Sequence, residues 1–144
     1  MRLLQDEGGW TFLETLIAIG VIVALTGTVG VAGTRLVSRA RRVAAQSQIE
    51  SYALAVNAYA ADCGRVPTEA QGLSALWQRP ALEPVPEGWN GPYLSGEVTA
   101  DPWGGAYEYR VPGPAGLAFG IVSYGSDGRP GGSANAADLY SWTR

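Results

Sequence analysis

The sequence predicts an α+β protein in which one long N-terminal α-helix carries a small head with an antiparallel β-sheet. Two observations predict this fold class. Residues 12–62 contain no proline, and the part of the chain after Gly64 consists of short apolar segments between glycine- and proline-rich turns. The 144 residues suffice for one domain, or for one small domain with an appendage.

The first half of the expected helix, residues 10–34, is apolar. No charged residue occurs from Thr15 to Thr34, and twenty helical residues span roughly 30 Å, the thickness of a bilayer's hydrocarbon core. A secretory signal peptide is the alternative, but its apolar region is usually about 7–15 residues long and follows a basic segment. Here residues 1–9 carry one arginine against two acidic residues. We therefore expect a membrane-spanning helix.

The second half, residues 35–63, is expected to be an amphipathic helical stem. Its apolar residues recur every three or four positions, which places them on one face of a helix. They are Ile49, Tyr52, Val56 and Tyr59, with Ala45, Ala53 and Ala60 beside them. Gly64 and then Pro67 are typical of residues that end a helix. We expect the apolar face to pack against the head.

The head, residues 64–144, is expected to contain a short helix and three short strands. Thr68 and Gln71 have the spacing of a capping box, and the helix that they open should reach Trp77. The expected strands are residues 107–111, 117–123 and 139–143, with Gly113, Pro114 and Gly116 in the turn between the first two. A head of this size is too small for a large core of its own, so it should lean on the stem.

The composition excludes several classes of enzyme. All ten basic residues are arginine, so there is no lysine for a Schiff base or a P-loop. There is also no histidine for a Ser-His-Asp or Cys-His system, and the single Cys63 excludes an internal disulfide. The net charge of −3 disfavours nucleic acid as a partner. We therefore expect no catalytic residues.

One acidic residue, Glu14, lies at the edge of the apolar segment. A carboxylate near hydrocarbon costs about 2.5–3.5 kcal/mol, so such a residue is a candidate functional site. The alternative is that Glu14 lies at the membrane interface or in the first turn of the helix, where the helix dipole favours a negative charge.

The segment from Gly9 to Glu14, Gly-Trp-Thr-Phe-Leu-Glu, resembles the class III signal of type IV pilins and pseudopilins, in which Gly-Phe-Thr-Leu-x-Glu opens a long apolar helix. The resemblance implies that residues 1–9 are a leader peptide, that a prepilin peptidase cleaves between Gly9 and Trp10, and that Trp10 is then N-methylated. It also implies that Glu14 pairs with the free amine of Trp10 on a neighbouring subunit during assembly, which lowers the cost of burying either charge. Trp10 departs from the usual phenylalanine, and the leader lacks the usual basic residue before the glycine.

Four segments of the head are similar to the major pseudopilin of type II secretion systems. They are residues 65–73 (RVPTEAQGL), 88–94 (GWNGPYL), 101–107 (DPWGGAY) and 123–128 (SYGSDG). The resemblance implies a type IV pilin-like fold and a single-pass inner-membrane protein with its head in the periplasm. It implies a homopolymer, a periplasmic pseudopilus whose growth drives export of folded proteins across the outer membrane. The implied partners are minor pseudopilins, the prepilin peptidase, and an inner-membrane assembly platform with its ATPase.

Two other functions are compatible with the same sequence. One is a subunit of a true type IV pilus or a competence pilus, although true pilins commonly close the head with a disulfide. The other is a membrane-anchored periplasmic binding module that never polymerises. Topology also has two interpretations, because the positive-inside rule would keep Arg35, Arg39, Arg41 and Arg42 in the cytoplasm whereas the resemblance places them outside.

The glycine-rich segment from Ser123 to Asp138 is a candidate calcium site, because its carboxylates, amide and carbonyl groups are oxygen ligands of the kind that Ca²⁺ prefers. A solvated turn is the alternative. The resemblance implies calcium here, because related pseudopilins bind this ion in the same loop. The implied ligands are Asp127, Asp138 and the carbonyl of Tyr124, with Ser133 or Asn135 as a neutral oxygen where Ala136 replaces an acidic residue of the family.

The apolar segment contains no proline, although pseudopilins often carry one there, but it has four glycines. They are Gly20, Gly27, Gly30 and Gly33. Gly27, Gly30 and Gly33 lie three apart on one face of the helix, which suits close helix packing. The alternative is that residues 26–33 unwind when the subunit enters a filament, since glycine weakens a helix by about 1 kcal/mol relative to alanine.

Overall fold

The computed structural model describes residues 10–143, except for the side chains of residues 26–32 and Asn135. The chain divides into two compact units, residues 1–37 and 38–144. One element, the α-helix α1 (Phe12–Cys63), contributes to both units, and its bounds agree with the expected helix. The expected α+β fold class, a long helix with a small antiparallel sheet, is confirmed.

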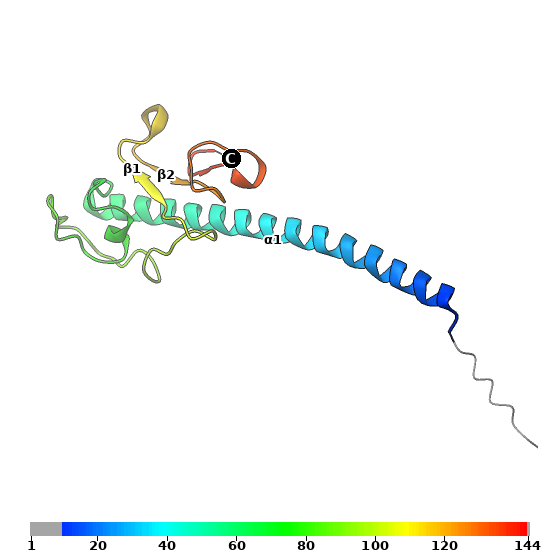
Figure 1. The fold of residues 1–144 in the computed structure, drawn as a ribbon. Coiled ribbons are helices and arrows are strands. Elements are labelled where there is room, and N and C mark those ends of the chain that lie inside the picture. The colour runs from blue at the N-terminus through cyan, green and yellow to red at the C-terminus, as the bar shows by residue number, and fades with distance from the viewer. Residues whose placement is uncertain (1–9, 144) are drawn as a thin grey trace, which may run out of the picture. The chain divides into compact units, whose positions relative to one another are not determined.

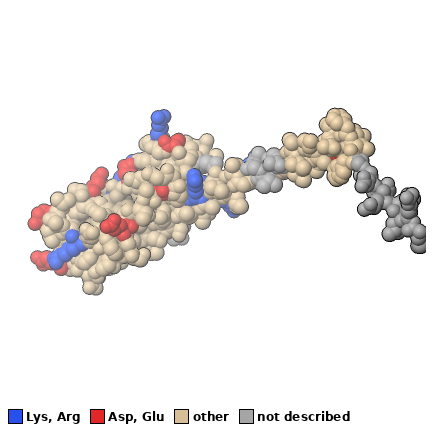
Figure 2. All heavy atoms as spheres, turned by 60° about the horizontal axis from the view of Figure 1, so that its bottom comes forward, with Lys and Arg blue, Asp and Glu red and all other residues tan. Residues whose placement is uncertain are grey.

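In the first unit, the described side chains of α1 are almost all exposed. Figure 2 shows the described part of this unit almost entirely in the colour of uncharged residues. Residues 26–32, in the C-terminal half of the segment expected to cross a membrane, lie outside the described side chains. No helical stretch within the described residues combines the length and the apolar character needed to cross a membrane.

In the second unit, one face of α1 is buried. Alanine, arginine, glutamine and leucine, all good helix formers, dominate this part of the helix. The buried residues are Ala45, Ile49, Tyr52, Ala55, Val56 and Tyr59, so the predicted apolar face is confirmed. The helix ends where Gly64 adopts a φ of 72° and its N–H donates to the carbonyl of Ala60 at 2.9 Å. Only glycine adopts this left-handed conformation without strain, which explains the stop.

The sheet has three antiparallel strands in the order β1 (Glu108–Arg110), β2 (Gly120–Ser123) and β3 (Leu139–Tyr140). In register, Tyr109 faces Ile121 and Val122 faces Tyr140. Figure 1 shows β1 and β2 alongside the C-terminal half of α1, and all four residues of β2 are buried. The three predicted strands are therefore confirmed in place and order, although each is shorter than expected.

The predicted helix between Pro67 and Trp77 is wrong in its extent. The capping box exists: the N–H of Thr68 donates to Gln71 Oε1 at 3.0 Å, and the N–H of Gln71 donates to Thr68 Oγ1 at 3.2 Å. However, Gly72 follows with a φ of 60°, and the only helical part is the 3₁₀ turn η1 (Leu73–Leu76). The left-handed glycine interrupts the helix that the capping box would otherwise begin.

Aromatic side chains join the loops of the head to the buried face of α1. The rings of Tyr52 and Tyr107 meet edge to face with centroids 5.3 Å apart, and those of Tyr59 and Tyr93 do so at 5.7 Å. Trp89 packs against Tyr93 and donates its indole N–H to the carbonyl of Ala75 at 3.0 Å. The core of the second unit is thus built from both the stem and the head, as expected from the size of the head.

Candidate functional site

The N-terminal site is built around a capping box at the start of α1. The N–H and the hydroxyl of Thr11 both donate to Glu14 Oε2 at 3.0 Å, and the N–H of Glu14 donates to Thr11 Oγ1 at 3.2 Å. These bonds satisfy donors that a helix start leaves unpaired. The Thr-x-x-Glu spacing from Thr11 to Glu14 is a sequence signal for this box, as the spacing from Thr68 to Gln71 is for the one in the head. Glu14 thus occupies the first turn, one of the two positions considered for it.

The predicted cleavage falls between Gly9 and Trp10, and Gly9 lies outside the described residues. Trp10, the expected mature N-terminus, has 76% of its surface exposed. The pairing of Glu14 with the amine of a neighbouring Trp10 involves a second chain and stays a prediction. Within one chain, the carboxylate is already held in a defined place by Thr11.

The second candidate site is the C-terminal loop, residues 124–138, which connects β2 to β3 and contains the 3₁₀ turn η3 (Ala134–Ala136). Of the two aspartates in this loop, Asp138 has the shorter hydrogen bonds. Its Oδ2 accepts from the N–H of Gly131 at 2.9 Å and from the hydroxyl of Tyr140 at 2.8 Å. Its Oδ1 is buried and has no hydrogen-bond partner among the described residues. A buried carboxylate oxygen without a partner is costly, so this atom is suited to a cation.

The other predicted ligands are arranged more loosely. Asp127 is exposed, and its Oδ1 accepts from the N–H of Arg129 at 3.3 Å. Ser133 is exposed and precedes η3, while the side chain of Asn135 lies outside the described residues. The hydroxyl of Tyr124 bonds to Glu108 and Arg110 on β1, so this side chain fastens one end of the loop to the sheet. Among the described residues, no three carboxylate, thiol or imidazole groups gather as metal ligands.

A contact that the sequence did not predict joins the C-terminal loop to α1. Nη1 of Arg42 donates to the carbonyl oxygens of Ala134 and Ala137, each at 2.9 Å. The partners are 92 and 95 positions away in the sequence. No local pattern signals such a contact, because Arg42 looks the same in the sequence as its neighbours Arg39 and Arg41.

Two charged residues on β1 form an ionic cluster with a tyrosine of the C-terminal loop, and the role of this cluster is structural. Arg110 forms an ion pair with Glu108, and both contact the hydroxyl of Tyr124. The hydrogen bond from Arg110, followed by that from Tyr124, lowers the pKa of Glu108. The hydrogen bond to Glu108 is the main cause that raises the pKa of Tyr124. Each shift favours the protonation states that the cluster already has at neutral pH.

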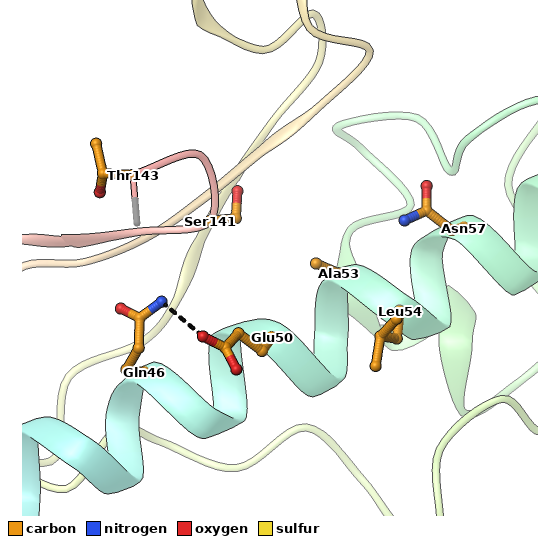
Figure 3. A pocket seen from close by; sticks show the side chains of 7 residues that line it. All are labelled: Gln46, Glu50, Ala53, Leu54, Asn57, Ser141 and Thr143. Atoms are coloured by element: carbon orange, nitrogen blue, oxygen red, sulfur yellow. Dashed lines mark hydrogen bonds between the residues drawn. The ribbon is translucent and has the colours of Figure 1, made fainter.

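An open groove of about 660 Å³ lies between α1 and the C-terminal residues of the head (Figure 3). Its lining is mixed in polarity and consists of Gln46, Glu50, Ala53, Leu54, Asn57, Ser141 and Thr143. Glu50 is the only titratable group in this set, and it accepts from Gln46 Nε2 at 3.3 Å. A single carboxylate without a partner acid, base or nucleophile does not form a catalytic arrangement. Over the visible face of the second unit, acidic and basic side chains are interspersed (Figure 2).

Comparison with known proteins shows similarity over most of the chain. The family model described as "Type II secretion system (T2SS), protein G" matches residues 34–142. A type II secretion system core protein G from Pseudomonas aeruginosa is 32% identical over 138 residues, covering 96% of both chains. The protein of the same name from Xanthomonas campestris pv. campestris is 37% identical over 133 residues, covering 92% of this chain and 88% of the relative.

A solved structure supports the same relationship. The crystal structure of the major pseudopilin from the type 2 secretion system of enterohaemorrhagic Escherichia coli is 31% identical to this chain. It superposes with a TM-score of 0.61 over 72% of this chain and 88% of the pseudopilin chain. The expected pilin-like fold is thereby confirmed.

Proposed function

Because this chain belongs to the type II secretion system protein G family, a family of structural pseudopilins, we propose that it is the subunit that polymerises into a type II secretion pseudopilus. The observation that carries this proposal is the similarity over nearly the full length to two core proteins G. It extends beyond the head to the N-terminal helix, the part that joins subunits in the proposed filament.

The N-terminal helix has two successive roles in this proposal. The uncharged run from Thr15 to Thr34 holds the precursor in the inner membrane with its head in the periplasm. The prepilin peptidase removes residues 1–9, and Trp10 becomes the N-methylated mature terminus. The same helix then packs against those of other subunits as the filament grows.

Glu14 selects the axial position of each new subunit. Its carboxylate is held in the first turn of α1 by Thr11, so it is already oriented before a neighbour arrives. The amine of Trp10 on the adjacent subunit neutralises it, and the pair then enters the apolar filament interior at a lower cost than either charge alone. Minor pseudopilins, the assembly platform and its ATPase start and drive this growth, which moves folded proteins across the outer membrane.

The head transmits the movement of the stem because the two form one core. Ile49, Val56 and Tyr59 on α1 have no exposed surface, and they pack with Ile121 of β2 in one cluster. Full burial of an isoleucine or valine side chain contributes about 1.5–3 kcal/mol, so the head cannot easily separate from the stem. A displacement of the helix therefore carries the head with it.

Calcium is the ion proposed for the C-terminal loop. The described residues fit a cation at Asp138, whose buried Oδ1 lacks a hydrogen-bond partner among them. Asp127 and the carbonyl of Tyr124 would complete the charged and neutral oxygens, with Ser133 or Asn135 as a further neutral ligand. A bound ion would supply a positive charge that orders the loop. Two carboxylates in place of three make the expected affinity weaker.

A comparison of two variants tests the proposed role of Glu14. Glu14→Gln removes the charge but keeps the size of the side chain, whereas Thr11→Val removes the capping hydroxyl and keeps the charge. In cells that carry the matching secretion system, we expect Glu14→Gln to lower the amount of sheared pseudopilus at least about tenfold. Thr11→Val should retain most of the assembly, because a lost cap costs only about 1 kcal/mol.

Three further outcomes are informative. Equal loss in both variants would show that Glu14 acts only as a cap, and normal assembly in Glu14→Gln would contradict the charge pairing. A wild-type chain that stays in the membrane and never polymerises would favour the binding module instead. Mass spectrometry of the mature chain checks the processing, because it should find an N-methylated Trp10 at the terminus.

A further inference from the structure

We propose that the guanidinium of Arg42 is the resident cation of the C-terminal loop and that it holds this loop against α1. Arg42 Nη1 donates to the carbonyl oxygens of Ala134, the first residue of η3, and of Ala137, the residue after it, each at 2.9 Å. All three residues belong to the second unit. This inference goes beyond the proposed function, because it concerns how the loop is held whether or not it also takes calcium.

The loop presents these carbonyl groups at a conformational cost. Ala134 has a φ of 52°, in the left-handed region that costs a non-glycine residue about 1–2 kcal/mol. Its carbonyl accepts from the N–H of Ala137 as well as from Arg42. A guanidinium is permanently charged and only donates hydrogen bonds, so it suits a site made of carbonyl oxygens alone. Charge-assisted bonds of this kind are stronger than neutral ones and offset the strain at Ala134.

Other contacts hold the loop to itself, to β3 and, through the hydroxyl of Tyr124, to β1. Asp138 Oδ2 joins the N–H of Gly131 to the hydroxyl of Tyr140. Gly132 lies so close to η3 that an added Cβ would be 2.4 Å from the carbonyl oxygen of Ala136. These contacts make the loop compact, whereas the two bonds from Arg42 determine where it lies on α1.

The position of Arg42 also restricts where a metal ion can bind. A divalent cation on the carbonyl oxygens of Ala134 and Ala137 would lie within a few ångströms of the guanidinium charge and be repelled by it. The calcium site proposed above therefore has to use other oxygens, beginning with Asp138 Oδ1. The loop has two separate cation positions, and one of them is permanently filled by a side chain.

Hydrogen exchange of the full chain in detergent micelles, with a chelator present throughout, tests the role of Arg42. Arg42→Met keeps the length of the side chain and removes the charge and the donors. We expect amides of residues 131–138 to exchange at least about tenfold faster in this variant, because bonds to charged groups are lost. Peptides from β2 and from residues 45–59 should exchange as in the wild type.

Two matched variants separate the contact from the overall charge. Arg41→Met removes a charge from the same turn of α1 and should leave the exchange of the loop unchanged. Arg42→Lys keeps a charged donor and should retain most of the protection. Wild-type exchange of the loop in Arg42→Met would overturn the proposal, and so would equal acceleration in Arg41→Met. The chelator makes these results independent of the calcium proposal.

If Arg42→Met raises hydrogen exchange throughout the head, a second measurement on the wild-type chain tests the proposal. In protein labelled with ¹⁵N-arginine, a guanidinium held by two carbonyl groups rotates slowly and gives separate Nη signals. The spectrum of Arg42→Lys identifies which signals belong to Arg42. Separate Nη signals would support the proposal, and a single averaged signal would overturn it.

Discussion

At the scale of single residues, the buried carboxylate of Asp101 shows how one side chain joins distant parts of the head. Its Oδ1 accepts from the N–H groups of Trp103 and Gly105 at 3.0 and 2.7 Å, which closes the turn that follows it. Its Oδ2 accepts from the hydroxyl of Ser123 on β2 at 2.6 Å. Both Asp101 and Ser123 are buried, so neither can exchange its partner for water.

We expect Asp101→Asn to lower the free energy of unfolding by about 2–3 kcal/mol. The amide has one acceptor oxygen in place of two, so either the turn or Ser123 loses its partner in a buried place. Thermal unfolding of the full chain in detergent, followed by circular dichroism, measures the effect.

Glu97→Gln is the matched control for this substitution, because Glu97 is exposed and its change should alter stability by less than about 0.5 kcal/mol. Equal midpoints for Asp101→Asn and the wild type would contradict the role assigned to the carboxylate.

Only half of the role of Asp101 can be inferred from the sequence. An aspartate before Pro102 indicates a turn, and the turn exists because its bonds are local. The bond to Ser123 crosses 22 positions, and it depends on how β2 packs. For the same reason the capping box at Thr68 could be predicted from spacing, whereas the contact between Arg42 and the loop could not.

At the scale of elements, periodicity predicted α1 well, because a helix repeats the same geometry at each turn. The apolar spacing identified Ile49, Tyr52, Val56 and Tyr59, and all four are buried. The short helix after Pro67 was predicted too long, because the capping box indicated a helix start but the conformation of Gly72 depends on the fold around it. The sequence predicted the three strands but not their ends, because pairing with a neighbouring strand determines where a short strand stops.

The C-terminal loop is the element on which calcium should act. With free calcium at millimolar concentration, we expect the thermal midpoint of the full chain to rise relative to the chelated protein, because an ion that binds only the folded state stabilises it. Asp138→Asn should abolish this rise, since Asp138 has the buried oxygen without a partner among the described residues.

Magnesium is the control for the ion, because it is smaller and gives up its water less readily, so its effect should be smaller. Glu97→Gln is the control for a general loss of negative charge. An unchanged midpoint in millimolar calcium would rule out a physiological calcium site in this loop.

At the scale of the whole molecule, buried and half-buried tyrosines link the stability of the head to pH. Burial raises the pKa of Tyr93 to about 12 and also raises the pKa values of Tyr107 and Tyr109. In the unfolded chain a tyrosine titrates near 10. Since the folded state holds these protons more tightly, their contribution to stability is complete below about pH 10. It is lost as the pH rises through the raised pKa of each group, which is about 12 for Tyr93.

We therefore expect the thermal midpoint to change little between pH 7 and 9 and then to fall steadily above pH 10. Tyr93→Phe cannot ionise, so its midpoint should be lower at neutral pH, because the hydroxyl bonds to Asp62 and Asn90 are lost, but should fall less steeply in alkali.

A return to neutral pH serves as the control for this titration, because it should restore the midpoint if ionisation alone caused the change. The same slope for the wild type and Tyr93→Phe would contradict a contribution from Tyr93.

The sequence by itself determined the features that depend on local spacing: the bounds of the long helix, its buried face, the order of the strands and the family. Only the tertiary structure decided the contact between the C-terminal loop and α1, because it joins groups far apart in the chain. The loop illustrates this difference. Asp127 and Asp138 were visible as acidic residues, but the unpartnered oxygen of Asp138 and the hold of Arg42 on the loop exist only after β3 and α1 have packed together.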